Sequence, residues 1–189
     1  MTPCGRCAVW ALSQKAVREQ YAAWRDCLLG MMSGILSRKI TKKEFLQMSI
    51  PALFKGRLAL PVIGAPLFII SVPDLVIAQC KAGVVGSFPA LNARPPALLD
   101  EWLARIREEL AAHDKMHPGR PSAPFAVNQI VHKSNNRLNH DLALCEKHRV
   151  PMIISSLGAR EELNQAVHGW GGIVFHDVIN QKFAHKAIE

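Results

Sequence analysis

The sequence predicts an α/β fold built on a parallel sheet. From Leu60 onward, short runs rich in Val, Ile and Phe alternate with segments of helical periodicity, which is typical of repeated strand–helix units. These runs are apolar almost throughout, as strands are when helices cover a parallel sheet. The 189 residues are 49% hydrophobic and 20% charged, which is the composition of a globular protein.

Five apolar runs are the expected strands, and each is followed by a helical pattern. The runs are Pro61–Gly64, Gly83–Ser87, Phe125–Val131, Val150–Ser155 and Gly172–His176. After the first run, Ser71 is the expected cap of a helix that has Pro73 in its first turn, and Gly83 is the expected stop.

The later helices are predicted by apolar residues that recur every three or four positions. The clearest is Ala97–Ala112, which places Leu99, Leu103 and Ile106 on one face. Weaker patterns precede the fourth and fifth runs, and Gln181–Ile188 follows the fifth. Pattern alone leaves a doubly wound sheet and an eight-stranded barrel open. The open sheet is the simpler of the two, because residues 48–189 offer five units and a barrel needs about 250 residues.

The distribution of charge divides the chain into two parts, and the cysteines indicate its redox setting. Residues 1–47 hold eight basic and three acidic residues, whereas residues 48–189 hold fifteen and twelve. We therefore expect a basic extension over 1–47, helical or poorly ordered, and a body over 48–189 that binds no specific nucleic acid. Five scattered cysteines indicate a reducing, cytoplasmic setting. We expect no membrane segment and no metal site.

Four motifs carry a resemblance to a known family. They are Leu60–Phe68 (Leu-Pro-Val-Ile-Gly-Ala-Pro-Leu-Phe), Gly83–Ala90, Phe125–Gln129 and Ile173–Asp177, in that order. They resemble the nitronate monooxygenases, formerly called 2-nitropropane dioxygenases, over about residues 48–189. The resemblance implies the amino-terminal part of an FMN-dependent TIM-type (β/α)8 barrel, with about five βα units present. It also implies oxidation of alkyl nitronates by molecular oxygen, and it overrules the open sheet.

The resemblance implies a set of flavin contacts at the carboxyl ends of the strands. The expected cofactor-binding residues are Ala65, Pro66, Leu67, Asn128, Gln129, Ser155 and His176. A small residue followed by a rigid proline would let backbone approach the ring, and an asparagine offers the flavin both a donor and an acceptor. Asp177 stands where some family members carry a lysine. Ser156, next to Ser155, could also donate a hydrogen bond to flavin or substrate. The sequence equally allows a buried amide satisfied by neighbouring backbone at Asn128, a helix cap at the serines, and a core or rim histidine at His176.

The family's catalytic residue is a histidine in a Gly-Gly-His segment. The Gly-Gly pair here, Gly171-Gly172, is followed by Ile173, so we assign no catalytic residue within the chain and expect that histidine beyond Glu189. A partial barrel also has unpaired edges, which predicts self-association. The alternative functions are a non-catalytic barrel fragment, an interaction protein, or a related flavin-dependent enoyl reductase.

Overall fold

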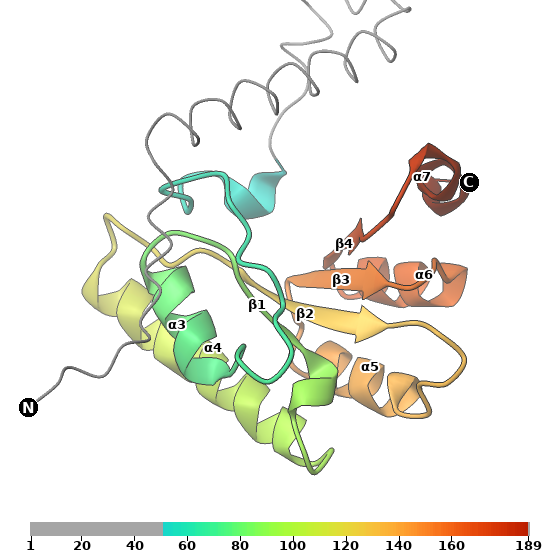
Figure 1. Cartoon of the computed structure of the whole chain (residues 1–189). Coiled ribbons are helices and arrows are strands. Elements are labelled where there is room, and N and C mark those ends of the chain that lie inside the picture. Colours follow the sequence, from blue (N-terminus) through green and yellow to red (C-terminus); the bar gives the residue numbers. More distant parts are fainter. Residues whose placement is uncertain (1–50, 189) are drawn as a thin grey trace, which may run out of the picture. The chain divides into compact units, whose positions relative to one another are not determined.

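Four of the five apolar runs form a parallel sheet in the computed structural model, which describes residues 51–188 (Figure 1). The strands are β1 (Gly86–Pro89), β2 (Phe125–Ile130), β3 (Met152–Ser156) and β4 (Ile173–His176). Their order in the sheet is β1-β2-β3-β4, and every neighbouring pair is parallel. The expected extension over 1–47 lies outside the described residues.

The strand order identifies the architecture as part of an α/β barrel. In a doubly wound sheet the order reverses at a switch point, whereas in a barrel each strand pairs with the next one along the chain. Within residues 51–188 the order follows the sequence without a reversal. The prediction of a partial barrel is therefore confirmed over the open sheet.

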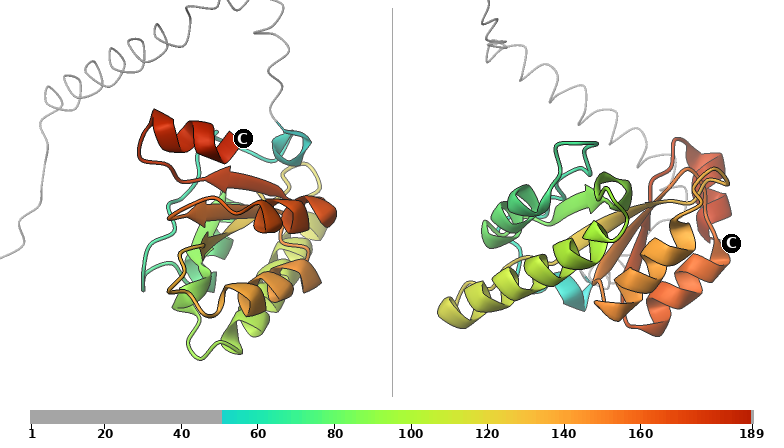
Figure 2. Two further views of the ribbon diagram at one scale, coloured as in Figure 1. Left: turned by 90° about the vertical axis from the view of Figure 1, so that its right-hand side faces the viewer. Right: turned by 90° about the horizontal axis from the view of Figure 1, so that it is seen from below.

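Helices follow each strand and cover one face of the sheet, as Figure 2 shows for α3 to α6. The helical elements are η1 (Ala52–Phe54), α3 (Pro73–Lys81), η2 (Ala90–Asn92), α4 (Leu98–Met116), α5 (Leu138–Lys147), α6 (Glu161–Gly169) and α7 (Gln181–Ile188). The main core lies between the sheet and helices α3 to α6, where Leu103 and Ile106 of α4 are fully buried beside Phe88 of β1. None of the helices within 51–188 is long and apolar enough to cross a membrane.

The two faces of the sheet differ in what covers them. Phe88, Val127 and Ile153 belong to the core beneath the helices, and we call this side the outer face. Side chains alternate along a strand, so the intervening residues, such as Ala126 and Met152, point to the opposite side, which we call the inner face. This face is covered only in part, by residues that include Phe54 of η1.

The first expected strand, Pro61–Gly64, forms a single bridge instead of a ladder, and that prediction is wrong. Ile63 pairs with Val85, whose N–H donates to the Val62 carbonyl at 3.2 Å and whose carbonyl accepts from the N–H of Gly64 at 2.7 Å. Pro61 lacks an N–H and cannot extend the ladder. The segment therefore continues the sheet beyond β1 as a short, exposed edge.

The start of α3 also differs from the expected cap. Val72 is the N-cap residue and makes no side-chain cap, and Pro73 is the first helical residue. The Ser71 hydroxyl instead accepts a hydrogen bond from the N–H of Leu67 at 2.9 Å, so it stabilises the preceding loop. The end of the helix is confirmed, because Gly83 follows it with a φ of +81°, a conformation that favours glycine.

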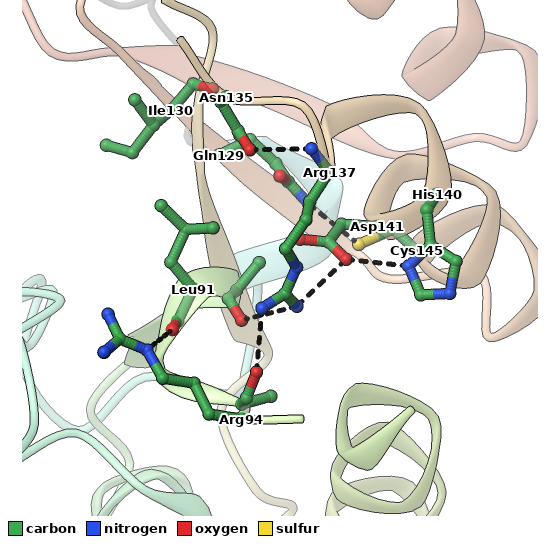
Figure 3. A network of polar contacts seen from close by, with 11 residues as sticks. Leu91, Arg94, Gln129, Ile130, Asn135, Arg137, His140, Asp141 and Cys145 are labelled. Atoms are coloured by element: carbon green, nitrogen blue, oxygen red, sulfur yellow. Dashed lines mark hydrogen bonds and ion pairs between the residues drawn. The ribbon is translucent and has the colours of Figure 1, made fainter. Parts of the chain in front are cut away.

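A buried ion pair ties α5 to the turn that follows β1 (Figure 3). The Asp141 side chain is fully buried, and its Oδ1 accepts from Nη2 of Arg137 at 3.1 Å and lies 3.0 Å from Nδ1 of His140. Arg137 also donates Nη1 to the Ala93 carbonyl at 2.9 Å and Nη2 to the Ala90 carbonyl at 3.5 Å. One guanidinium therefore joins two βα units.

Candidate functional site

Three polar residues lie together on the inner face, where the strands end. Asn128 is in the second half of β2, Ser156 is the last residue of β3, and Asp177 follows β4 directly. Because the strands are parallel and adjacent, their carboxyl ends meet at one edge of the sheet. In α/β barrels this edge carries the active site.

Hydrogen bonds join these three residues into a row. The Nδ2 group of Asn128 donates to the Ser156 hydroxyl at 2.7 Å and to the Ile154 carbonyl at 3.0 Å. The Ser156 hydroxyl donates in turn to Oδ2 of Asp177 at 3.3 Å. Asn128 is 4% exposed and Ser156 is 8% exposed, whereas Asp177 is exposed. The row therefore runs from a buried amide to a carboxylate at the rim.

The orientation of the Asn128 amide follows from its partners. A carbonyl oxygen can only accept, so the atom that faces Ile154 must be the amide nitrogen. The carboxamide oxygen of Asn128 accepts no hydrogen bond from residues 51–188. It is absent from the fully buried atoms that lack a partner in that range, so it is unpaired without being fully buried. This oxygen is thus available to accept a hydrogen bond from a ligand.

The loop that contains Ala65, Pro66 and Leu67 lies at the same end of the sheet. The Ser87 hydroxyl of β1 donates to the carbonyl of Gly64, which immediately precedes this loop. The loop is held from the other side by Asn92, whose Nδ2 donates to the Leu67 carbonyl at 3.0 Å. The side chain of Leu67 is 47% exposed. The loop therefore presents small and apolar groups beside β1 in a fixed conformation.

The remaining expected site residues, Gln129, Ser155 and His176, lie on the outer face, away from Asn128. Gln129 pairs in register with Ser155, and Ser155 pairs with His176. Nε2 of Gln129 donates to the Cys145 thiol of α5 at 3.5 Å, and the Ser155 hydroxyl donates to the Gly158 carbonyl at 3.1 Å. The side chains of Gln129 and Ser155 are thus bound by α5 and by the loop after β3. They face away from Asn128 because consecutive strand residues point to opposite faces.

His176 sits in a different environment from the one expected at an active-site mouth. The residue is partly buried, and burial lowers the pKa of its imidazole below the ordinary value. Its Nδ1 atom is buried and has no hydrogen-bond partner among residues 51–188. The structure thus separates His176 from its neighbour Asp177, which belongs to the inner row.

Ser156 and Asp177 complete the row. The sequence presents Ser155 and Ser156 as alternative donors at the end of one strand and does not assign Asp177 a contact, and the signal that separates these residues is the period of two along a strand. If Asn128 faces inward, its register partner Ile154 also does, and Ser156 lies two residues further on the same face. The register between strands is the information that the sequence lacks.

A cavity of about 570 Å³ lies beside this row, a volume within the usual range of ligand pockets. It is bounded by the loops after β2 and β3, the connection after β4, and one side of α7. Its lining is mainly apolar, with one carboxylate, one ammonium and one imidazole group, and includes His132, Leu157, Asp177, Val178, Phe183 and Lys186. Asp177 therefore belongs to both the row and the cavity.

Comparisons with known proteins give a likeness in fold. No protein-family model matches the chain, and no curated protein matches it. The solved structure of FabK from Thermotoga maritima superimposes with a TM-score of 0.58 at 18% identity, covering 72% of this chain and 39% of FabK. A single-residue variant of FabK gives 0.57 at 17% identity, with 72% and 41% covered. The chain thus spans about two fifths of the length of FabK, and what the two share is the fold.

Proposed function

We propose that this chain is the amino-terminal part of an FMN-dependent oxidoreductase barrel of the nitronate monooxygenase type, which oxidises alkyl nitronates with molecular oxygen. The observation that carries the proposal is the row of Asn128, Ser156 and Asp177 on the inner face, at the carboxyl ends of three neighbouring strands. Polar groups at that position are unnecessary for a barrel core and are suited to a ligand. The motif resemblance supplies the identity of the cofactor.

The residues present fit the ring of a flavin. The pyrimidine edge of isoalloxazine carries one N–H donor between two carbonyl acceptors, and the Asn128 carboxamide oxygen is an acceptor free to meet that donor. Ala65 is an exposed residue, and its N–H donates to no group within residues 51–188, so it is free to meet a flavin acceptor. Ala65 and Pro66 carry no polar side chain that would compete. Bound FMN would supply the chemistry of taking electrons from the substrate and passing them to oxygen.

The contribution of these residues to the reaction is positioning. Asn128 would hold the ring edge, and the Ala65–Leu67 loop would limit how the ring tilts, because Asn92 and Ser71 fix its backbone. The mainly apolar cavity beside Asp177 suits an alkyl substituent. None of these residues is assigned the role of the general base that would take a proton from a neutral nitroalkane.

A flavin-dependent enoyl reductase is the second candidate. The fold is compatible with it, because the two enzyme classes use related barrels and the inner row would serve either of them. Oxidation of NAD(P)H separates the candidates, since a nitronate oxidase takes its electrons from the nitronate itself. A barrel fragment without activity is the third, and it would retain no flavin.

The experiment is a flavin absorbance spectrum of the purified 189-residue chain after incubation with FMN and removal of free cofactor. We expect the native chain to retain the flavin bands and Asn128→Ala to bind FMN at least tenfold more weakly, since one buried hydrogen bond is lost. Asn139→Ala is the matched control, because Asn139 is exposed on α5. Nitronate-dependent oxygen consumption should follow. A native chain that stays colourless would refute the proposal.

A further inference from the structure

The hydrogen-bonded row has a definite direction. Ser156 has one hydroxyl hydrogen, and that hydrogen is directed to Asp177. Its oxygen is then left as an acceptor, and the Asn128 Nδ2 group donates to it. The donors therefore all point the same way, from the amide through the hydroxyl to the carboxylate.

The far end of the row is held in place by backbone. The N–H of Asp177 donates to the Ser155 carbonyl at 2.9 Å, which continues the β3–β4 pairing one residue past β4. The Ser156 hydroxyl is the one side-chain partner of the Asp177 carboxylate among the described residues. The negative charge of Asp177 therefore lies beside the Ser156 hydroxyl, and no cation of residues 51–188 forms an ion pair with it.

The carboxylate changes the acceptor that Asn128 offers. Hydrogen bonds in a chain polarise one another, so a negative charge beyond Ser156 makes the free Asn128 oxygen a stronger acceptor. The same charge opposes an anionic group at this position. An amide turned the other way would bring its oxygen against the Ile154 carbonyl, which is unfavourable.

We infer that Asp177, acting through Ser156, fixes Asn128 so that it presents its carboxamide oxygen, and that the ligand edge bound there is a hydrogen-bond donor such as an imide N–H. Asp177 and Ser156 are positioning residues in this assignment. The inference rests on the proposed function for the identity of the ligand, whose ring offers one such N–H. It excludes a phosphate or carboxylate from the same position.

The orientation is tested without ligand, by proton exchange of the Asn128 side-chain amide in the NMR spectrum of the full chain. We expect both Nδ2 protons to exchange slowly, and at least tenfold faster in Ser156→Ala and Asp177→Ala. Ser156→Thr should restore slow exchange, because it keeps the hydroxyl. The exposed Asn139 amide should exchange fast in every variant. Unchanged exchange in Ser156→Ala would overturn the relay.

The ligand edge is tested by comparing FMN with 3-methyl-FMN, which lacks the imide proton. We expect the native chain to bind FMN at least tenfold more tightly, and this preference to fall below about threefold in Ser156→Ala. Equal affinity for the two flavins in the native chain would overturn the inference and leave the proposed function standing. A native chain that binds neither would refute the proposed function, while amide exchange still decides the orientation of Asn128.

Discussion

Replacement of Arg137 by methionine tests the buried ion pair that joins α5 to the turn after β1. The Asp141 side chain is fully buried and the Arg137 side chain is 18% exposed, so the substitution leaves a carboxylate in the core without its cation. Oδ2 of Asp141 already has no partner among residues 51–188, and the carbonyls of Ala90 and Ala93 lose a donor. Breaking a buried pair in this way costs about 3–5 kcal/mol in unfolding free energy.

Such a loss is a large fraction of the total stability of a domain, which is about 5–15 kcal/mol. The assay is urea unfolding of the full chain at pH 7 followed by circular dichroism, in which the midpoint should fall while the slope stays unchanged. Arg107→Met is the matched control, because Arg107 is exposed on α4, and its effect should stay within about 0.5 kcal/mol.

A double variant separates the charge from the loss of packing. Arg137→Met combined with Asp141→Leu removes both charges, so it should be more stable than Arg137→Met alone. The reasoning fails if Arg137→Met lies within about 1 kcal/mol of the native chain, or if the double variant is the less stable of the two.

Two further predictions concern acid stability and association. Hydrogen bonds from Lys147, the larger contribution, and from His148 lower the pKa of Asp100. The stabilisation that the Asp100 carboxylate provides is therefore present above the ordinary carboxyl pKa of about 4, and it is lost as the pH falls through the lowered pKa. Asp100→Asn should therefore lower the melting temperature at pH 7 but not near pH 2, and an equal difference at both pH values would contradict this. We also propose self-association through the partly covered inner face, where Phe175 is 36% exposed. Phe175→Lys should weaken the concentration-dependent association measured by sedimentation, and a native chain that is monomeric at every concentration would refute the proposal.

The sequence allowed the main elements to be predicted, because their signals are local. The apolar run Phe125–Val131 matches β2 (Phe125–Ile130) to within one residue, and the periodicity of Ala97–Ala112 identifies α4, which continues a further turn to Met116. Where a polar side chain has several partners within reach, local signals are insufficient. Ser71 has the residue type and position of a cap, yet the N–H of Leu67 competes for its hydroxyl.

The candidate site was only partly predictable, because its geometry depends on register. Asn128 stands out in the sequence as an amide within an apolar run, but the sequence does not show which neighbours share its face. Gln129 and Ser155 lie on the opposite face, toward the helices. Ser156 and Asp177 reach Asn128 only through pairings between β2, β3 and β4. Those pairings join residues far apart in the chain, and the sequence carries no direct record of them.

The sequential strand order has a consequence for how this chain folds during synthesis. Every strand pair within residues 51–188 joins neighbours in the sequence, so β1 and β2 can pair before β3 has been made, and each later unit adds to an edge that already exists. Chains emerge from the ribosome amino terminus first, and local pairings carry a small loop-closure cost. Folding can therefore proceed vectorially, and the growing edge of the nascent chain is the surface that needs protection until the next strand arrives.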